Sequence, residues 1–152
     1  MPKATKVEQD EYMFPSDVYF PAVLVAVDEK EIVFFKKDKA GNRTNEQSSF
    51  LKWQWSFEMV DGPYSGLTGY GETTAEYTNR EDNLVRQWGE TLLGRELDLG
   101  EEMDTDKLIG LPCMISFKHE EPRPKKDGTL YYGSPVEEVL PRTGDIAQIA
   151  PF

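Results

Sequence analysis

The clearest hydrophobic pattern in the sequence lies between residues 51 and 59. Apolar and polar residues alternate there one by one, in the order Leu51, Lys52, Trp53, Gln54, Trp55, Ser56, Phe57, Glu58 and Met59. Successive side chains of a β-strand point to opposite faces, so a period of two predicts a half-buried strand. We expect the aromatic row to face the core and the row of Lys52, Gln54 and Ser56 to be polar enough to line a groove.

A hairpin is expected directly after this strand. Asp61-Gly62-Pro63 has turn chemistry, because Asp bonds the backbone ahead of it, Gly accepts positive φ and Pro cannot enter a central ladder. The returning arm, residues 64–74, contains Gly66, Gly69 and Gly71. Glycines inside a strand indicate a bulge, a sharp bend or the close approach of another backbone.

The N-terminal half contains a second strand signal. Residues 18–27 are apolar on both faces, which predicts a central strand with Pro21 near its entry. Glu29 and Lys30 predict a turn or bulge, after which residues 32–35 continue this strand or pair with it. Residues 36–49 lack apolar side chains and predict a loop.

One helix is expected after the hairpin. Asn79 is a candidate N-cap, with Asp82 three residues later, and a stop is expected at Gly94. Apolar residues recur at helical spacing between them, at Leu84, Val85, Trp88 and Leu92.

The C-terminal half then predicts a short turn and two strands. Asp104 is expected to cap a turn that runs through Leu108 and closes at Gly110. Residues 113–117 alternate as a strand, and residues 119–129 form a loop. Residues 130–140 are the last expected strand, in which Gly133 and Pro135 indicate an edge or a bulge.

This order predicts a mainly β chain: a five-stranded OB-fold barrel with one helix between strands 3 and 4. The expected organisation is a flexible N-terminal arm over residues 1–17, an OB-fold domain over residues 18–141 and a C-terminal tail over residues 142–152. The chain has 152 residues, which suits one domain.

The chain resembles small OB-fold proteins encoded in the replication and recombination regions of tailed-phage genomes, many of which bind single-stranded DNA. The matching features are Trp53, Trp55 and Phe57; Asp61, Gly62, Tyr64 and Gly66; Trp88 with Leu92 and Gly94; Leu108, Gly110 and Cys113; and Asp127, Gly128, Tyr132, Leu140 and Pro141. The resemblance spans roughly residues 18–141. It implies single-stranded DNA binding in phage DNA replication or recombination.

The distribution of charge agrees with a nucleic-acid site at two loops. The net charge of the chain is −11, yet residues 36–52 carry +3 and residues 118–127 carry +1, whereas residues 58–110 carry −9. An OB-fold binds its ligand between the loops that join strands 1 and 2 and strands 4 and 5. Lysines also collect in loops without any ligand, and this alternative stays open. The candidate phosphate contacts are Lys36, Lys37, Lys39, Arg43, Lys52, Lys118, Arg123, Lys125 and Lys126.

Aromatic side chains that face outward would stack on bases. The candidates are Tyr64 and Tyr70 on the glycine-rich arm, and Tyr131 or Tyr132 beside the second basic loop. Lys126 next to Asp127-Gly128 predicts a hairpin tip able to fold over a bound strand.

The C-terminus shows a second, smaller resemblance. Bacterial single-stranded DNA-binding proteins end in an acidic tip finishing in Ile-Pro-Phe, which docks other replication and repair proteins. Pro151 and Phe152 match that ending and would be the partner-binding residues. Ala150 replaces the Ile, and Asp145 alone remains of the acidic run, so a plain frayed tail is the alternative.

The sequence predicts no enzyme, no cofactor and no metal. His119 stands alone, Cys113 lies among apolar strand residues, and the acidic residues from Glu101 to Asp106 lack the EF-hand pattern. No signal peptide or membrane-spanning run is present, so we expect a cytosolic protein, inside an infected host cell if the chain is phage-encoded. The alternative function is a protein-binding OB module, or an acidic nucleic-acid mimic acting on a host protein.

Overall fold

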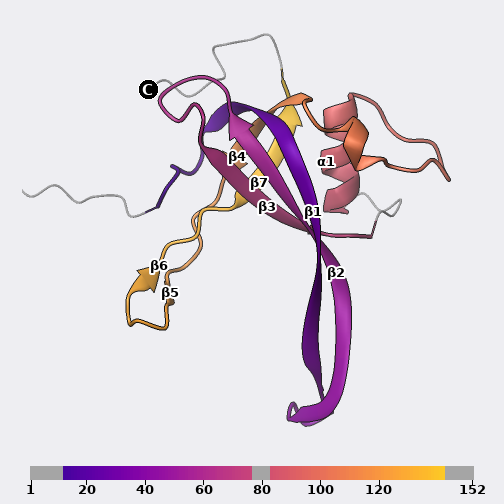
Figure 1. The fold of residues 1–152 in the computed structure, drawn as a ribbon, viewed down its shortest axis with the longest axis vertical. Helices are drawn as coiled ribbons and strands as arrows, with labels where there is room; N and C mark the ends of the chain where they lie inside the picture. Colours follow the sequence, from indigo (N-terminus) through magenta and orange to yellow (C-terminus); the bar gives the residue numbers. More distant parts are fainter. Residues whose placement is uncertain (1–11, 77–82, 143–152) are drawn as a thin grey trace, which may run out of the picture.

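The fold is mainly β (Figure 1). The computed structural model describes residues 12–76 and 83–142. Five antiparallel strands form one sheet in the order β3-β2-β1-β4-β7. Their bounds are β1 Tyr19–Lys37, β2 Arg43–Met59, β3 Thr68–Thr74, β4 Pro112–Phe117 and β7 Val136–Pro141; β5 Arg123–Pro124 and β6 Leu130–Tyr131 form a separate hairpin. The helix α1, Leu84–Leu93, and the 3₁₀ turn η1, Thr105–Lys107, lie between β3 and β4 in the chain.

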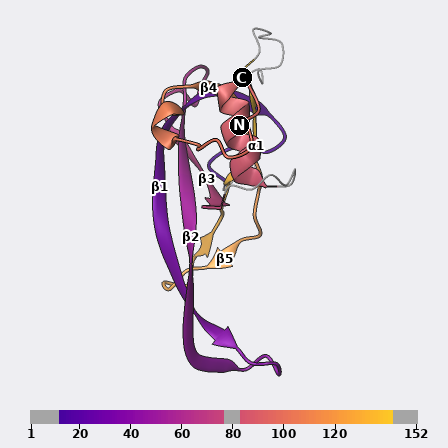
Figure 2. The same cartoon turned by 90° about the vertical axis from the view of Figure 1, so that its right-hand side faces the viewer.

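The core lies between one face of the sheet and α1, which contacts β7, β3 and β4 (Figure 2). Trp55, Phe57 and Met59 are buried, as the alternation predicted. Trp55 donates from Nε1 to Thr73 Oγ1 at 2.8 Å, and its ring lies edge-on to that of Trp88 with centroids 5.5 Å apart. The indole of Trp88, on α1, thus packs against the core-facing side of the sheet.

The sheet is open where a closed barrel was expected. Hydrogen-bonded pairing ends with β3 on one side and β7 on the other. The two edges meet through side chains instead, because Val136 of β7 and the Trp88 ring both lie against the backbone of β3 at Gly71. Bulky core groups therefore occupy the position that a closing ladder would take.

Two glycines of β3 allow this arrangement. A methyl group on Gly69 would lie 2.6 Å from the Phe117 ring, and one on Gly71 would lie 2.6 Å from the Trp88 ring. The groups that approach the glycine-rich arm are therefore side-chain rings, Phe117 and Trp88, and not the other backbone that the glycines predicted.

The strands β1 and β2 extend far beyond the sheet as a two-stranded ribbon (Figures 1 and 2). Only Tyr19–Val23 of β1 pair with β4, and only Lys52–Glu58 of β2 pair with β3, whereas the β1–β2 ladder runs to Lys37 and Arg43. We call residues 28–37 and 43–54 the ribbon; at its base, residues 52–54 also pair with β3. Leu51 lies on it and is exposed, so the apolar row of β2 leaves the core at that point.

The ribbon corrects two sequence predictions. Glu29 and Lys30 form no turn, because they pair within the ladder with Trp53 and Lys52. The loop expected over residues 36–49 is reduced to a turn at residues 38–42, where Asp38 accepts from two backbone amides and Gly41 has φ +84°. A ribbon exposed on both faces needs no apolar alternation, which explains why the hydrophobic pattern missed it.

The helix starts later than predicted. Its N-cap is Asn83, whose side chain accepts from the backbone amide of Arg86, and Asn79 lies outside the described residues. The predicted stop at Gly94, with φ +75°, is confirmed, as is the Asp104 cap of the short turn that ends at Leu108.

The expected last strand is divided, and the expected arm contributes to the core. Residues 130–140 form β6 and β7 with Gly133 and Pro135 in the break between them. Phe14, within the expected arm, is buried and stacks on Phe117 with centroids 4.3 Å apart. The adjacent residues Tyr12, Met13 and Pro15 show no period of two or 3.6, so this contact could not be predicted from a hydrophobic pattern.

We expect Gly71→Ala to destabilise the protein. The added methyl group has to displace the buried Trp88 ring, and overpacking of this kind costs about 1–3 kcal/mol. Urea denaturation measures the change in the free energy of unfolding. Thr74→Ala on the exposed side of the same strand is the control and should stay within about 0.5 kcal/mol. A Gly71→Ala protein as stable as wild type would contradict the contact between the helix and β3.

Candidate functional site

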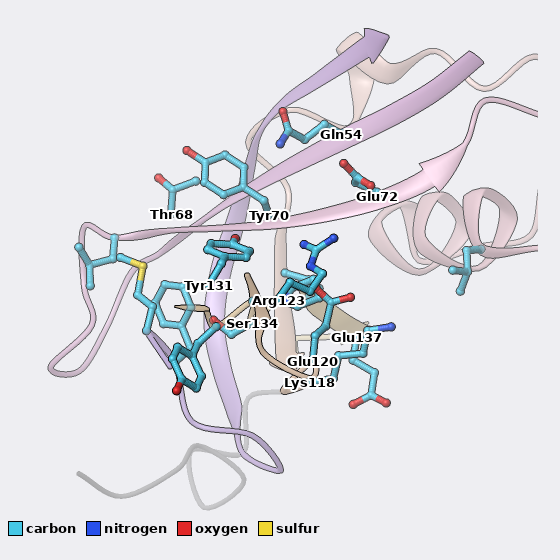
Figure 3. A pocket seen from close by; sticks show the side chains of 18 of the residues that line it. Gln54, Thr68, Tyr70, Glu72, Lys118, Glu120, Arg123, Tyr131, Ser134 and Glu137 are labelled. Carbon is cyan, nitrogen blue, oxygen red and sulfur yellow. The ribbon is translucent and has the colours of Figure 1, made fainter. Parts of the chain in front are cut away.

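An open groove of about 1010 Å³ lies between the outer face of β2 and β3 and the segment that joins β4 to β7 (Figure 3). Lys52 and Gln54 line it from β2, and Tyr70 and Glu72 line it from β3. Gln54 is directly opposite Glu72 in the ladder, so these side chains share one face. Lys52 and Gln54 of the polar row of β2 thus line a groove, whereas Ser56 of the same row is buried.

The opposite wall is the β5–β6 hairpin, which projects from the body on the same side as the ribbon (Figures 1 and 2). The hairpin tip expected at Asp127-Gly128 is confirmed. Lys125 donates its amide to the Thr129 carbonyl at 2.7 Å, and Asp127 Oδ1 accepts from the amide and the hydroxyl of Thr129 at 3.0 and 2.6 Å. These bonds lower the pKa of the Asp127 carboxyl, the hydroxyl bond having the largest effect.

Two exposed tyrosines line this groove. Tyr70 is 50% exposed and lines it from β3, and Tyr131 is 47% exposed and lines it from the β5–β6 hairpin, as does Arg123 (Figure 3). The Arg123 guanidinium carbon lies 5.6 Å from the centre of the Tyr131 ring, and Lys125 Nζ lies 5.9 Å from it. The hairpin therefore presents an aromatic face flanked by two cations.

Tyr132 occupies a different position at the base of the groove. The Tyr12 ring stacks on His119 with centroids 3.9 Å apart, and Tyr132 lies edge-on to Tyr12 at 5.2 Å. Tyr12 also donates its hydroxyl to the Glu120 carbonyl, and His119 Nε2 lies 2.7 Å from the Phe14 carbonyl oxygen. These contacts hold Tyr12 and Phe14 against the residues at the base of the β5–β6 hairpin. No sequence pattern predicted them.

The structure separates the predicted site residues into three groups. The groove holds Lys52, Tyr70, Lys118, Arg123, Tyr131 and Tyr132, and the hairpin holds Lys125 and Lys126 near the same rim. At the far end of the ribbon lie Lys36, Lys37, Lys39 and Arg43.

Tyr64 does not belong to the groove. It is half-buried and packs beside Phe14 and Phe20, with ring centroids 5.8 and 5.4 Å apart. The expectation that it faces outward is wrong, because the chain after the turn folds back over the core. Pro151 and Phe152 lie outside the described residues.

The groove itself is electrically balanced. Its cations are Lys52, Lys118 and Arg123, and its anions are Glu72, Glu120 and Glu137. Lys52 and Glu72 form an ion pair of 2.5 Å across the ladder. Excess positive charge is found instead at the ribbon tip and the hairpin tip, on either side of the groove.

The sequence also contains a single thiol, Cys113, and a run of acidic residues from Glu101 to Asp106. Burial raises the pKa of the Cys113 thiol to about 12, so the side chain stays protonated. Within residues 12–76 and 83–142, no three His, Cys, Asp or Glu side chains are grouped to hold a metal ion.

None of the helices in these ranges is long and apolar enough to cross a bilayer. No known protein family and no curated protein matches the sequence.

We expect the hairpin tip to loosen in acid. Because its folded pKa is lowered, Asp127 stabilises the turn above the ordinary aspartate pKa of about 3.9. This contribution disappears as the pH falls through the lower folded value. The NMR shift of the Thr129 amide should follow the titration, and Asp127→Asn should abolish that dependence. A Thr129 amide that does not respond to pH would contradict the hydrogen bonds at the tip.

Proposed function

We propose that this protein binds single-stranded DNA in the groove between β3 and the β5–β6 hairpin. The observation that carries the proposal is that two exposed rings, Tyr70 and Tyr131, line one open groove, with Arg123 beside Tyr131. Large exposed aromatic faces next to cations suit unpaired bases, because every base offers a π-face for stacking. A double helix keeps its bases stacked inside and could not use these rings.

The surrounding polar groups support the same ligand. Gln54 and Thr68 offer hydrogen-bond donors and acceptors beside the rings, and Arg123 can meet a phosphate while it keeps its contact with Tyr131. The three carboxylates in the groove disfavour a phosphate at its centre. We therefore assign the bases to the groove and the backbone to its rim, along Lys52, Lys118, Lys125 and Lys126.

The ribbon extends this path. Lys36, Lys39 and Arg43 lie at its end, and Phe34 and Phe50 are 43% and 44% exposed on the face that continues from Gln54 and Lys52. Their ring centroids are 6.0 Å apart. A single-stranded DNA that leaves the groove along the ribbon would meet lysines first and then this second pair of aromatic rings.

The strand order and the position of these surfaces also favour a partly open OB barrel, in which the curled sheet is joined at its edges by side chains. Together with the sequence resemblance, this supports a role for the proposed binding in phage DNA replication or recombination. Docking of other proteins through Pro151 and Phe152, and an acidic surface acting on a host protein, stay predictions.

Replacing the groove tyrosines should weaken binding and spare the fold. A stacked base gains about 1–3 kcal/mol, so Tyr70→Ala and Tyr131→Ala should each reduce affinity for an oligonucleotide by roughly 5- to 150-fold. Both side chains are half exposed, so their removal leaves no buried cavity. Fluorescence anisotropy with a labelled single strand measures the effect.

Tyr64→Ala is the matched control for these variants. Its ring packs within the protein, so its removal should lower the melting temperature while affinity at low temperature is kept. Unchanged affinity in both groove variants would refute the proposed site.

Charge reversal at the ribbon tip should change the salt dependence of binding. We expect Lys36→Glu with Lys39→Glu to weaken binding and to reduce the slope of log affinity against log salt by roughly 0.7 for each phosphate that the tip no longer neutralises. Lys107→Glu, in η1, is the control and should leave the slope unchanged. A tip variant with the wild-type slope would remove the ribbon from the DNA path.

A further inference from the structure

The two faces of the ribbon differ in chemistry. Directly opposed residues of an antiparallel pair point to the same face. One face, which we call the groove face, continues from Gln54 through the rows Lys30–Lys52, Ile32–Phe50 and Phe34–Ser48. The other, the back face, consists of the rows Glu29–Trp53, Glu31–Leu51, Val33–Ser49, Phe35–Gln47 and Lys37–Arg43.

The back face has an apolar centre. Val33 is 57% exposed, Leu51 48% and Phe35 36%. A two-stranded ribbon has no second layer to cover such side chains, and isolated hairpins are marginal in water. A row of exposed apolar side chains with polar ends is typical of a protein interface.

Opposite charges flank this apolar centre. Glu29 and Glu31 lie on the side of the body, and Lys37 and Arg43 lie at the tip, where the Arg43 guanidinium sits 3.9 Å above the Phe35 ring. The back face is therefore neutral but strongly polarised along its length. Its two carboxylates disfavour a nucleic-acid backbone, whereas the groove face has an excess of lysine.

We propose that the back face binds the back face of a second copy of this chain, with the two ribbons antiparallel. A two-fold axis between the Val33 and Phe35 rows brings Glu31 of each copy opposite Lys37 of the other and Val33 opposite Phe35. One surface thus supplies both halves of the contact, which is the requirement of a closed dimer. The same pairing in parallel would oppose like charges.

The size of the surface sets the strength of the dimer. From Glu31 to Lys37 the ribbon is about 20 Å long, at roughly 3.3 Å per residue. Two strands of this length place the contact in the class of small interfaces, below about 1,200 Å² in total. We therefore expect a reversible dimer that forms in the micromolar range and leaves both groove faces open. The dimer does not depend on DNA binding, so it can be tested without a ligand.

Sedimentation velocity of the full chain across the micromolar range tests the proposal. Wild type should shift from monomer to dimer as its concentration rises. Glu31→Lys and Lys37→Glu should each raise the dissociation constant by about tenfold, because each reversed charge acts twice in a two-fold dimer even though single exposed pairs are weak.

An equimolar mixture of the two variants is the decisive experiment. In the heterodimer the charges at both ends become opposite again, so the mixture should associate as wild type does while neither variant does so alone. Asp28→Lys makes the same reversal as Glu31→Lys but on the groove face, and it should leave the dimer unchanged. A monomeric wild type, a dimer that survives both single variants, or a mixture that fails to associate would overturn the proposal.

Discussion

The contact of the Trp88 ring with Gly71 is the constraint on which the rest of the molecule depends. Because β3 has no side chain there, the helix can lie against the sheet, and the indole reaches both Trp55 and the β7 residue Val136. The edges β3 and β7 are thereby held close without hydrogen bonds between them. The outer face of β3 is left next to the β4–β7 segment, and this proximity forms the groove.

The sequence predicted the parts of the fold that bury a face. Trp55, Phe57 and Met59 alternate because one side of β2 is covered, and Gly94 and Asp104 cap their turns through local hydrogen bonds. These signals depend on a few neighbouring residues, which is why they could be read without the structure. The ribbon has no covered face, and residues 43–49 therefore read as a loop although they form a ladder.

The candidate site was predictable in its residues but not in its arrangement. Composition identified the lysines and tyrosines, and the structure brings Tyr70 and Tyr131 to one groove although their segments are far apart in the chain. Tyr64 and Tyr70 both lie on the glycine-rich arm, and nothing in the local sequence distinguishes them. Tyr64 nevertheless packs beside Phe14. The difference comes from Phe14 itself, which fills a gap in the core, and its sequence context gave no sign of a long-range contact.

The separation of opposite charges makes the proposed DNA surface compatible with a net charge of −11. The carboxylates are concentrated after β3, where Glu101 forms an ion pair of 2.7 Å with Arg95 and has its pKa lowered to about 2 by this bond. The ribbon and the β5–β6 hairpin hold their cations well out from the body. Because the Debye length at physiological salt is about 8 Å, a phosphate at the ribbon tip is screened from the acidic body and responds to the local lysines. In the proposed complex, the acidic segment after β3 would repel a phosphate that comes within this distance, whereas the lysines at the two tips would attract one.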